Sequence, residues 1–201
     1  MMFSHNFHRP KNLNDEQQEN RYFLLYYQLI KHGFGFRYAN PNLIDKVFVA
    51  VMLDDMPDTK EKVDSFKNYV SSISQTVAYS GKNVFFPKEH MAEVNSHSHC
   101  ILQGLDIILG AMQFRLNDLH KEIPEGQRVR GKRTRAKERV YKEINKLIRQ
   151  THPNFNICSS TGVGGEYSNR WHKPYMHWCF VPKEHDKDFS AVKGKAPPQP
   201  T

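Results

Sequence analysis

Residues 46–55, KVFVAVMLDD, decide the predicted fold of this chain. After its lysine the run is continuously apolar and rich in valine, which is typical of a strand covered on both faces. Asp54 and Asp55 follow at once and end the apolar run. A helix is expected next, over about 59–74, with Asp58 as its N-cap. The stretch therefore predicts a strand–helix unit with two carboxylates at the strand end.

Helix and strand signals alternate on both sides of this stretch. Apolar residues recur at helical spacing in some segments, whereas other segments are short apolar runs bounded by turn residues. Helices are expected over 15–31, 59–74, about 96–119 and 134–150, and strands over 34–39, 46–53, 83–87, 90–94, 155–158 and 176–181. Because the two kinds of element alternate along the chain, the predicted class is α/β with a mixed sheet flanked by helices.

The composition limits the class of protein. With 201 residues, 38% of them hydrophobic, the chain is long enough for one packed core with an appendage. Charged residues interrupt every apolar run before it reaches the ~20 residues of a membrane span, and the first ten residues lack the apolar centre of a signal peptide. The three cysteines form no C-x-x-C pair, which argues against a disulfide framework and a zinc ribbon. We therefore expect a soluble cytoplasmic protein without a membrane partner.

Positive charge is concentrated in one segment. Residues 128–139, RVRGKRTRAKER, contain seven basic side chains and one acid, which gives the segment a net charge of +6 in a chain whose total is +8. A cationic patch of this density favours a polyanionic partner such as nucleic acid. The alternative is that these residues form the solvent-exposed start of a helix and only keep the protein soluble. The predicted phosphate contacts are Arg128, Arg130, Lys132, Arg133, Arg135, Lys137 and Arg139.

An acid stands in the most apolar stretch of the chain. In CILQGLDIILGAM, residues 100–112, the only polar side chains after the first cysteine are Gln103 and Asp106. A buried carboxylate requires a cation, a hydrogen-bond donor or a proton. If Asp106 approaches Asp54 or Asp55, the carboxylates can hold Mg²⁺ or Mn²⁺ and activate water for phosphodiester cleavage. The alternative is that Asp106 pairs with an arginine or caps a backbone group, and that the strand-end acids are turn residues.

A histidine-rich segment precedes this apolar stretch. In HMAEVNSHSHC, residues 90–100, Glu93, His97 and His99 are residue types that ligate zinc or manganese. The spacing matches neither H-E-x-x-H nor another specific zinc-binding motif. These residues are therefore weaker metal-ligand candidates than Asp54, Asp55 and Asp106. One functional hypothesis is therefore a small-molecule hydrolase centred on this cluster. Stoichiometric zinc in the purified protein would favour it.

Cations and aromatics alternate in RWHKPYMHW, residues 170–178. Arg170 and Lys173 are predicted to contact phosphates while the neighbouring rings stack on bases. The alternative is a set of amphipathic residues that closes the far edge of the core.

The stretch VNSHSHCILQGLDIILGAMQFRL resembles a pattern in a bacterial protein family. Ser96, Leu102, Gln103, Asp106 and Gly110 match S-x-x-x-x-x-LQ-x-x-D-x-x-x-G, which lies near the end of the RNase H-like core in the family labelled domain of unknown function 3800. The strand VFVAVMLDD is similar to the central strand of that family. The segments YKEINKLIRQTHPNFNICSSTG and RWHKPYMHWCF are similar to the C-terminal extension of some members. The resemblance covers roughly residues 20–182.

The resemblance implies an RNase H-like sheet with a metal-dependent nuclease centre. Asp106 would be the helix-borne carboxylate, Asp54 or Asp55 the strand-borne one, and Gln103 would steer the substrate or a metal-bound water. The family opens with a strand ending in Asp-Glu-Ser, whereas no strand of that type precedes the first expected helix here. The chain is therefore expected to be a fragment, a truncated member or a member without catalysis.

Two functional hypotheses follow from these patterns. The first is a nuclease or phosphodiesterase that uses Mg²⁺ or Mn²⁺. The second is an inactive RNase H-like module that binds nucleic acid or serves in an assembly, for example in a mobile-element or defence system. Binding that does not weaken with salt would indicate a protein partner instead, including a second copy of the chain. The expected organisation is an RNase H-like core over 1–119, a basic helix and C-terminal extension over 120–182 packed on that core, and a disordered tail over 183–201.

Overall fold

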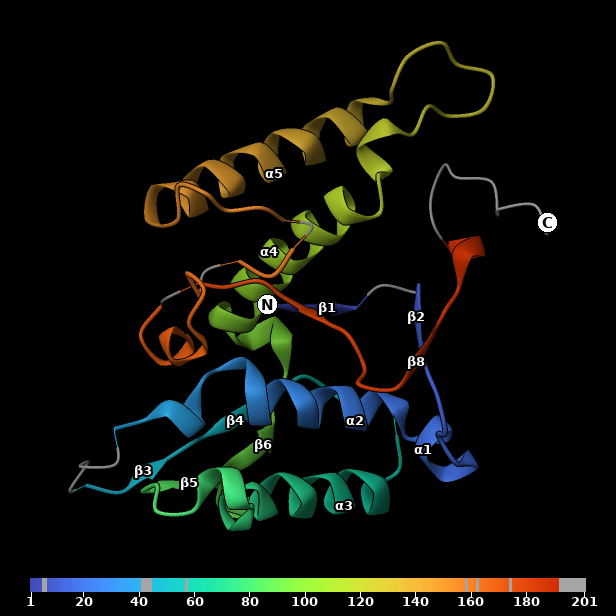
Figure 1. Ribbon diagram of the computed structural model, residues 1–201. Coiled ribbons are helices and arrows are strands. Elements are labelled where there is room, and N and C mark those ends of the chain that lie inside the picture. Colours follow the sequence, from blue (N-terminus) through green and yellow to red (C-terminus); the bar gives the residue numbers. More distant parts are fainter. Residues whose placement is uncertain are drawn as a thin grey trace, which may run out of the picture.

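The computed structural model describes residues 1–4, 7–40, 45–56, 58–157, 159–161, 163–173 and 175–191. Helices and short strands alternate along this part of the chain, which confirms the general α/β class (Figure 1). The strands pair two by two. The parallel pairs are β1 (Met2–Ser4) with β7 (Trp178–Phe180), β3 (Val47–Phe48) with β5 (Val84–Phe85) and β4 (Val51–Leu53) with β6 (Met91–Glu93), and the antiparallel pair is β2 (His8–Pro10) with β8 (His185–Lys187).

The predicted strand at 46–53 is divided into β3 and β4. Burial alternates along both pieces, and Phe48 and Met52 are each 54% exposed. The expectation of a strand covered on both faces is therefore wrong. One face packs on the core, whereas no described element covers the other, so that the large side chains on that face contact solvent.

The larger core lies between strands β3 to β6 and the helices that precede and follow β3 and β4. The helices that contribute to it are α2 (Arg21–Gln28), a π-helical turn at Leu29–Gly33, and α3 (Lys60–Ser71), whereas the preceding α1 (Asp15–Glu19) has no buried residue. The rings of Phe23 on α2 and Phe66 on α3 lie 5.2 Å apart, and both belong to this core. Its other buried members are Ile30, Ala39, Leu53, Met56, Val63, Val70, Ile73, Tyr79, Val84, Phe86 and Met91.

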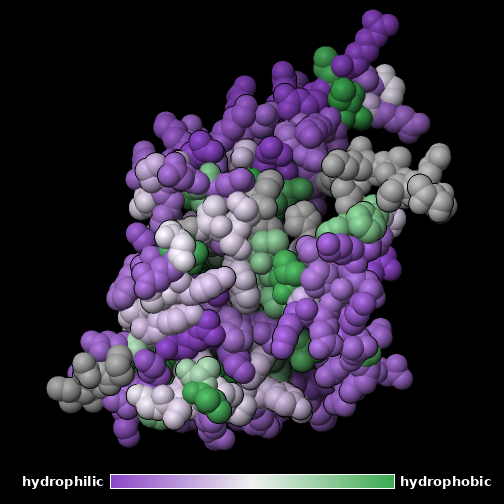
Figure 2. Space-filling view, in the orientation of Figure 1, coloured by the Kyte–Doolittle hydropathy of each residue, from purple (hydrophilic) through white to green (hydrophobic). Residues whose placement is uncertain are grey.

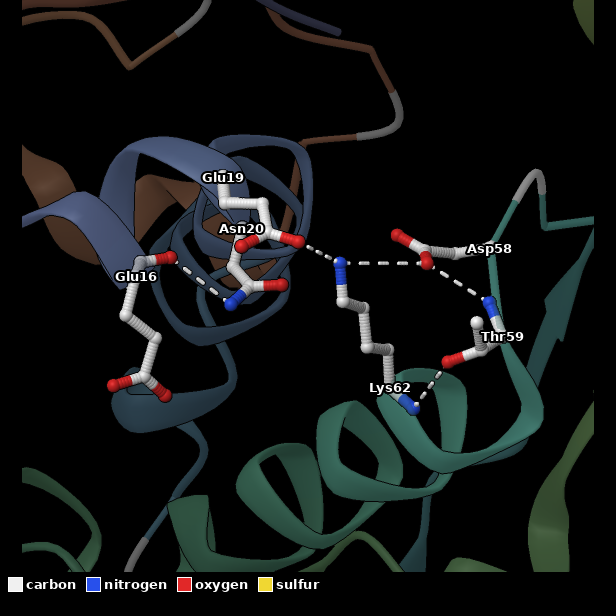
Figure 3. Close-up of polar contacts among 6 residues, drawn as sticks. All are labelled: Glu16, Glu19, Asn20, Asp58, Thr59 and Lys62. Carbon is white, nitrogen blue, oxygen red and sulfur yellow. Dashed lines mark hydrogen bonds and ion pairs between the residues drawn. The ribbon is translucent and has the colours of Figure 1, made fainter.

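Polar contacts join α1 to the beginning of α3 (Figure 3). Thr59 is the N-cap of α3 and accepts a hydrogen bond from the Lys62 backbone N–H at 3.4 Å, whereas Asp58 accepts from the Thr59 N–H at 2.8 Å. The predicted N-cap is thus displaced by one residue. Lys62 Nζ lies 3.6 Å from Asp58 and also pairs with Glu19 of α1, so one ammonium connects the two helices.

A second, smaller core forms between α4 (Cys100–Leu116) and α5 (Lys132–Thr151), which pack against each other. Its buried members are Met112, Ile148, Phe155 and Ile157. Only the C-terminal part of α4 is enclosed, since its buried residues are Ala111, Met112 and Phe114. The exposed apolar side chains of α4 are Ile101, Leu105, Ile107 and Leu109. This helix pair joins residues from both sides of the predicted domain boundary at 119/120.

Several local predictions differ from the structure. Residues 34–39 do not form a strand but contain the 3-10 helix Phe36–Tyr38, which Gly35 introduces with a positive φ of 73°. Residues 155–157 are not a strand, and Cys158 lies outside the described residues. β8 and the 3-10 turn Phe189–Ala191 fall in the predicted disordered tail, which is therefore wrong for these residues, and residues 192–201 lie outside the described part. In the described chain every helix is too short or too polar to cross a bilayer.

Candidate nucleic-acid interface and carboxylate edge

Acidic residues gather where two parallel strands end. β4 and β6 pair with Leu53 opposite Glu93, so Asp54 and Asp55 follow β4 beside the last residue of β6. Both aspartates are exposed, and the Asp54 carboxylate accepts a hydrogen bond from the Asp55 backbone N–H at 3.0 Å. The structure thus places Glu93, one of the weaker candidates from the sequence, at the same edge as the two stronger ones.

The Glu93 carboxylate is already engaged. Its Oε2 accepts a hydrogen bond from the Met56 backbone N–H at 3.3 Å, and its Oε1 lies 3.8 Å from Lys67 Nζ on α3. These contacts hold the turn after β4 against the end of β6. A metal ion at this edge therefore competes with the Lys67 ammonium for the same carboxylate.

Asp106 is exposed on α4, so the expectation of a buried carboxylate is wrong. The physical reason is that the fully buried residues of α4 all lie near its C-terminus, and Asp106 lies on a side of the preceding turns that no described element covers. Hydration then stabilises the charge without a protein partner. No hydrogen bond or ion pair among the described residues connects Asp106 with Asp54 or Asp55.

Gln103 and the histidines have local roles at the start of α4. Gln103 Nε2 donates to the carbonyl oxygens of Ser96 at 3.0 Å and His97 at 2.7 Å, which ties the preceding 3-10 turn to the helix. His99 is the N-cap, and its Nδ1 accepts from the Leu102 backbone N–H at 3.4 Å. Within the described residues, no three His, Cys, Asp or Glu side chains are grouped so as to hold a metal ion. The roles predicted for Asp106, Gln103, His97 and His99 in a metal site stay predictions.

The basic segment has a clear geometry. Arg130 donates to the Glu138 carboxylate and to the His120 carbonyl, both at 2.7 Å, and so fixes the loop before α5 to the helix. The other six cations are exposed and make no hydrogen bond or ion pair with any described residue. They are Arg128, Lys132, Arg133, Arg135, Lys137 and Arg139. The dark purple side chains at the top of Figure 2 cover α5 and show this polar surface.

The cationic face continues further along α5 than the sequence interpretation placed it. Exposed basic residues follow one another at steps of three or four residues, which puts them on one side of a helix. They are Lys132, Arg135, Arg139, Lys142, Lys146 and Arg149. In this second half the cations are engaged: Lys142 pairs with Glu138 at 3.0 Å and Lys146 with Glu143 at 3.7 Å. The helical spacing of the last three was the signal that could have identified them.

Arg170 lies inside the protein, away from the exposed face of α5. It is 8% exposed, and its Nη1 donates to the His32 carbonyl at 2.7 Å. The guanidinium carbon is 4.7 Å from the Trp178 ring centre and 5.3 Å from that of Tyr167, so aromatic faces supply part of its stabilisation. Burial lowers the pKa of this guanidinium. Lys173, by contrast, is exposed.

Arg170, Lys173 and Trp178 line a cavity of about 410 Å³. Its other walls come from the π-helical turn Leu29–Gly33 and the residues after it, from the middle of α4, and from further residues between 163 and 177. Burial raises the pKa of Tyr175 in its wall to about 12 and lowers the pKa of His177 to about 4. The sequence pointed to residues 170–178, but it did not show that this segment closes a cavity with α4.

The sequence matches no protein-family model, and neither the curated proteins nor the solved structures contain a significant match to it.

Proposed function

We propose that this protein is a cytoplasmic nucleic-acid-binding module whose main contact surface is the basic face of α5. The observation that carries the proposal is that Lys132, Arg135 and Arg139 of this face are exposed and have no acidic partner in the described chain. Arg128 before the helix, and Arg133 and Lys137 on another side of it, are exposed and unpaired among the described residues as well. Unpaired surface cations repel one another, and a phosphate backbone removes this repulsion while counterions are released from it.

The shape of α5 supports a linear polyanion as the partner. The helix has 20 residues and is therefore about 30 Å long, with cations along one side. Its first turn contains no acidic residue, so the positive end of the helix dipole adds to the same field. A compact anion would engage only a fraction of this surface, whereas a nucleic-acid backbone can follow it.

The RNase H-like fold is part of the proposal. Its support consists of the parallel pairs β3–β5 and β4–β6, which lie next to α2 and α3 in Figure 1, and of acids at the ends of β4 and β6. The resemblance of residues 94–116 to the family labelled domain of unknown function 3800 adds to this support.

Salt-dependent binding tests the proposed surface. Labelled duplex and single-stranded oligonucleotides are titrated with the protein between 50 and 200 mM salt, and anisotropy gives the affinity. Each lost phosphate contact reduces the slope of log K against log salt by about 0.9. We expect Arg135→Gln combined with Arg139→Gln to reduce the slope by about 1.8 and to weaken binding to every sequence alike.

The matched control removes the same charge elsewhere. Lys60 on α3 and Lys183 are exposed and unpaired among the described residues, so Lys60→Gln with Lys183→Gln has the same net charge as the α5 variant. This control should keep the wild-type slope. A flat salt dependence in the wild type, or an equal loss in both double variants, contradicts the proposal and favours a protein partner.

Cleavage of phosphodiesters with Mg²⁺ or Mn²⁺ is the second candidate function. The observation behind it is that Asp54 and Asp55 follow β4 at the edge of the sheet with both side chains exposed. Carboxylate oxygens are suitable ligands for both cations, and metal-activated water is a sufficient nucleophile for this reaction. Asp106 on α4 would join this site if its carboxylate reaches the bound ion.

A further inference from the structure

The cavity beside Arg170 is aromatic and free of acids. Among the residues that line it are five aromatic ones and two with permanent cationic side chains, and none of its lining residues is Asp or Glu. The aromatics are Phe34, Phe36, Trp171, Tyr175 and Trp178, and the cations are Arg170 and Lys173. In Figure 2, pale and green residues cross the middle of the molecule, below the purple side chains over α5.

Arg170 is a buried cation without a counter-ion. None of the ion pairs formed by the described residues includes it, and one of its five N–H donors is bonded to the His32 carbonyl. No other hydrogen bond from this guanidinium to a described residue is present. Further cations lie close by. Burial, together with the charges of Arg37, Lys31 and Arg170, lowers the pKa of His32 to about 4. A buried guanidinium in such a field is stabilised by an anion.

The groove between α1, α2 and α3 shows the opposite character. Its volume is about 730 Å³, and Glu16, Glu19 and Glu61 line it together with Lys62. It is larger than the Arg170 cavity but is unsuited to an anion. The charge of its lining, and not its size, therefore distinguishes the cavity at Arg170.

We propose that the Arg170 cavity binds one nucleotide of a single strand, with its base against the aromatic rings and its phosphate at Arg170 and Lys173. The volume of about 410 Å³ lies within the usual range of small-ligand sites. A flat apolar group and an anionic group in one ligand satisfy both parts of the lining. Base stacking on aromatic rings next to arginine is a general mode of single-strand recognition. The inference rests on the proposed function, because α5 would deliver the strand.

Free ligands test the cavity without α5. Calorimetry on the full chain compares thymidine monophosphate with its two halves, thymidine and inorganic phosphate. We expect the nucleotide to bind at least tenfold more tightly than either half. Phosphate that binds as tightly as the nucleotide indicates an unspecific anion site and overturns the proposal.

Two pairs of variants separate the cavity from the rest of the surface. Leu105 lines the cavity from α4, and Leu105→Trp should fill it, whereas Ile107→Trp changes an exposed position of the same helix that does not line it. Lys173→Gln removes the exposed cation at the cavity, and Lys60→Gln is its matched control on α3. Leu105→Trp and Lys173→Gln both leave Arg170 and its hydrogen-bond partner, the His32 carbonyl, unchanged.

Oligonucleotide binding then gives the decisive comparison. We expect the wild type to prefer (dT)12 over a 12-base-pair duplex, and Leu105→Trp to reduce single-strand affinity about tenfold while duplex affinity stays unchanged. Lys173→Gln should weaken thymidine monophosphate several-fold, and both controls should match the wild type. Affinities within twofold of the wild type in both cavity variants overturn the proposal. Duplex binding without nucleotide binding refutes the cavity alone, whereas nucleotide binding without polymer binding refutes the α5 proposal alone.

Discussion

The free energy of unfolding should decrease steeply as the pH is lowered below neutrality, because His177 is buried as a neutral side chain. This side chain is 2% exposed, and its ring centre lies 4.6 Å from that of Phe155, a member of the second core. Its Nδ1 lies 3.3 Å from the Ile157 carbonyl, which only accepts, so Nδ1 carries the proton of the neutral ring. Nε2 lies 3.0 Å from the Tyr175 hydroxyl and accepts from it. Protonation of Nε2 forces this hydroxyl to reverse its role.

The magnitude follows from the pKa of His177, which burial lowers from 6.5 to about 4. Between these two pH values the unfolded chain binds the proton and the folded chain does not. Stability is therefore complete above about pH 6.5 and is lost as the pH falls towards 4, at about 1.4 kcal/mol per pH unit. The full loss is about 3 kcal/mol. His32, whose pKa burial also lowers to about 4, is less enclosed and adds a smaller loss over the same window.

Urea denaturation followed by circular dichroism at pH 7.5, 6.5, 5.5 and 4.5 measures this effect. Carboxylates also titrate in this range, so the comparison is made between variants at each pH. His177→Gln should lower the free energy of unfolding at pH 7.5 but remove about 1 kcal/mol per pH unit of its dependence below pH 6.5. His97→Gln, on an exposed histidine, should keep the wild-type dependence. Equal pH dependence in the wild type and His177→Gln would refute a neutral, buried His177.

Two further predictions concern the backbone at Gly35 and the acids at the sheet edge. Gly35→Ala should destabilise the protein by about 2–4 kcal/mol in urea denaturation, because φ is +73° and a Cβ would lie 2.5 Å from the backbone of Arg170 and Trp171. Gly81→Ala, with φ +72° and no atom within 4 Å, should cost only about 1–2 kcal/mol, and an equal cost at both sites would contradict the contact. Millimolar Mn²⁺ should raise the melting temperature if Asp54 and Asp55 bind it, since ligand at 100 Kd contributes about 2.7 kcal/mol. Asp54→Asn should abolish this increase, and an unchanged melting temperature in the wild type would contradict the metal site.

The sequence by itself determined the positions of the helices and of the basic segment. Apolar spacing located α3, α4 and α5 to within a few residues, because helical periodicity is a property of neighbouring positions in the chain. The single helix expected over 15–31 is divided into α1, α2 and the π-helical turn. The charges at 128–139 could be counted directly, and their exposure follows from the amphipathic pattern of α5. The two acids after β4 were likewise visible as a local end of an apolar run.

Burial and partnership were decided only by the tertiary structure. α4 is apolar on nearly all sides, so its sequence did not indicate that the turns around Asp106 remain uncovered. Glu93 reaches the edge beside Asp54 through strand pairing across about 40 residues of chain. Arg170 is buried, and its guanidinium bonds to the His32 carbonyl, 138 residues away in the chain. Local patterns reveal what a segment forms, whereas the neighbour that covers a side chain or removes its water is supplied by distant segments whose pairing no short pattern contains.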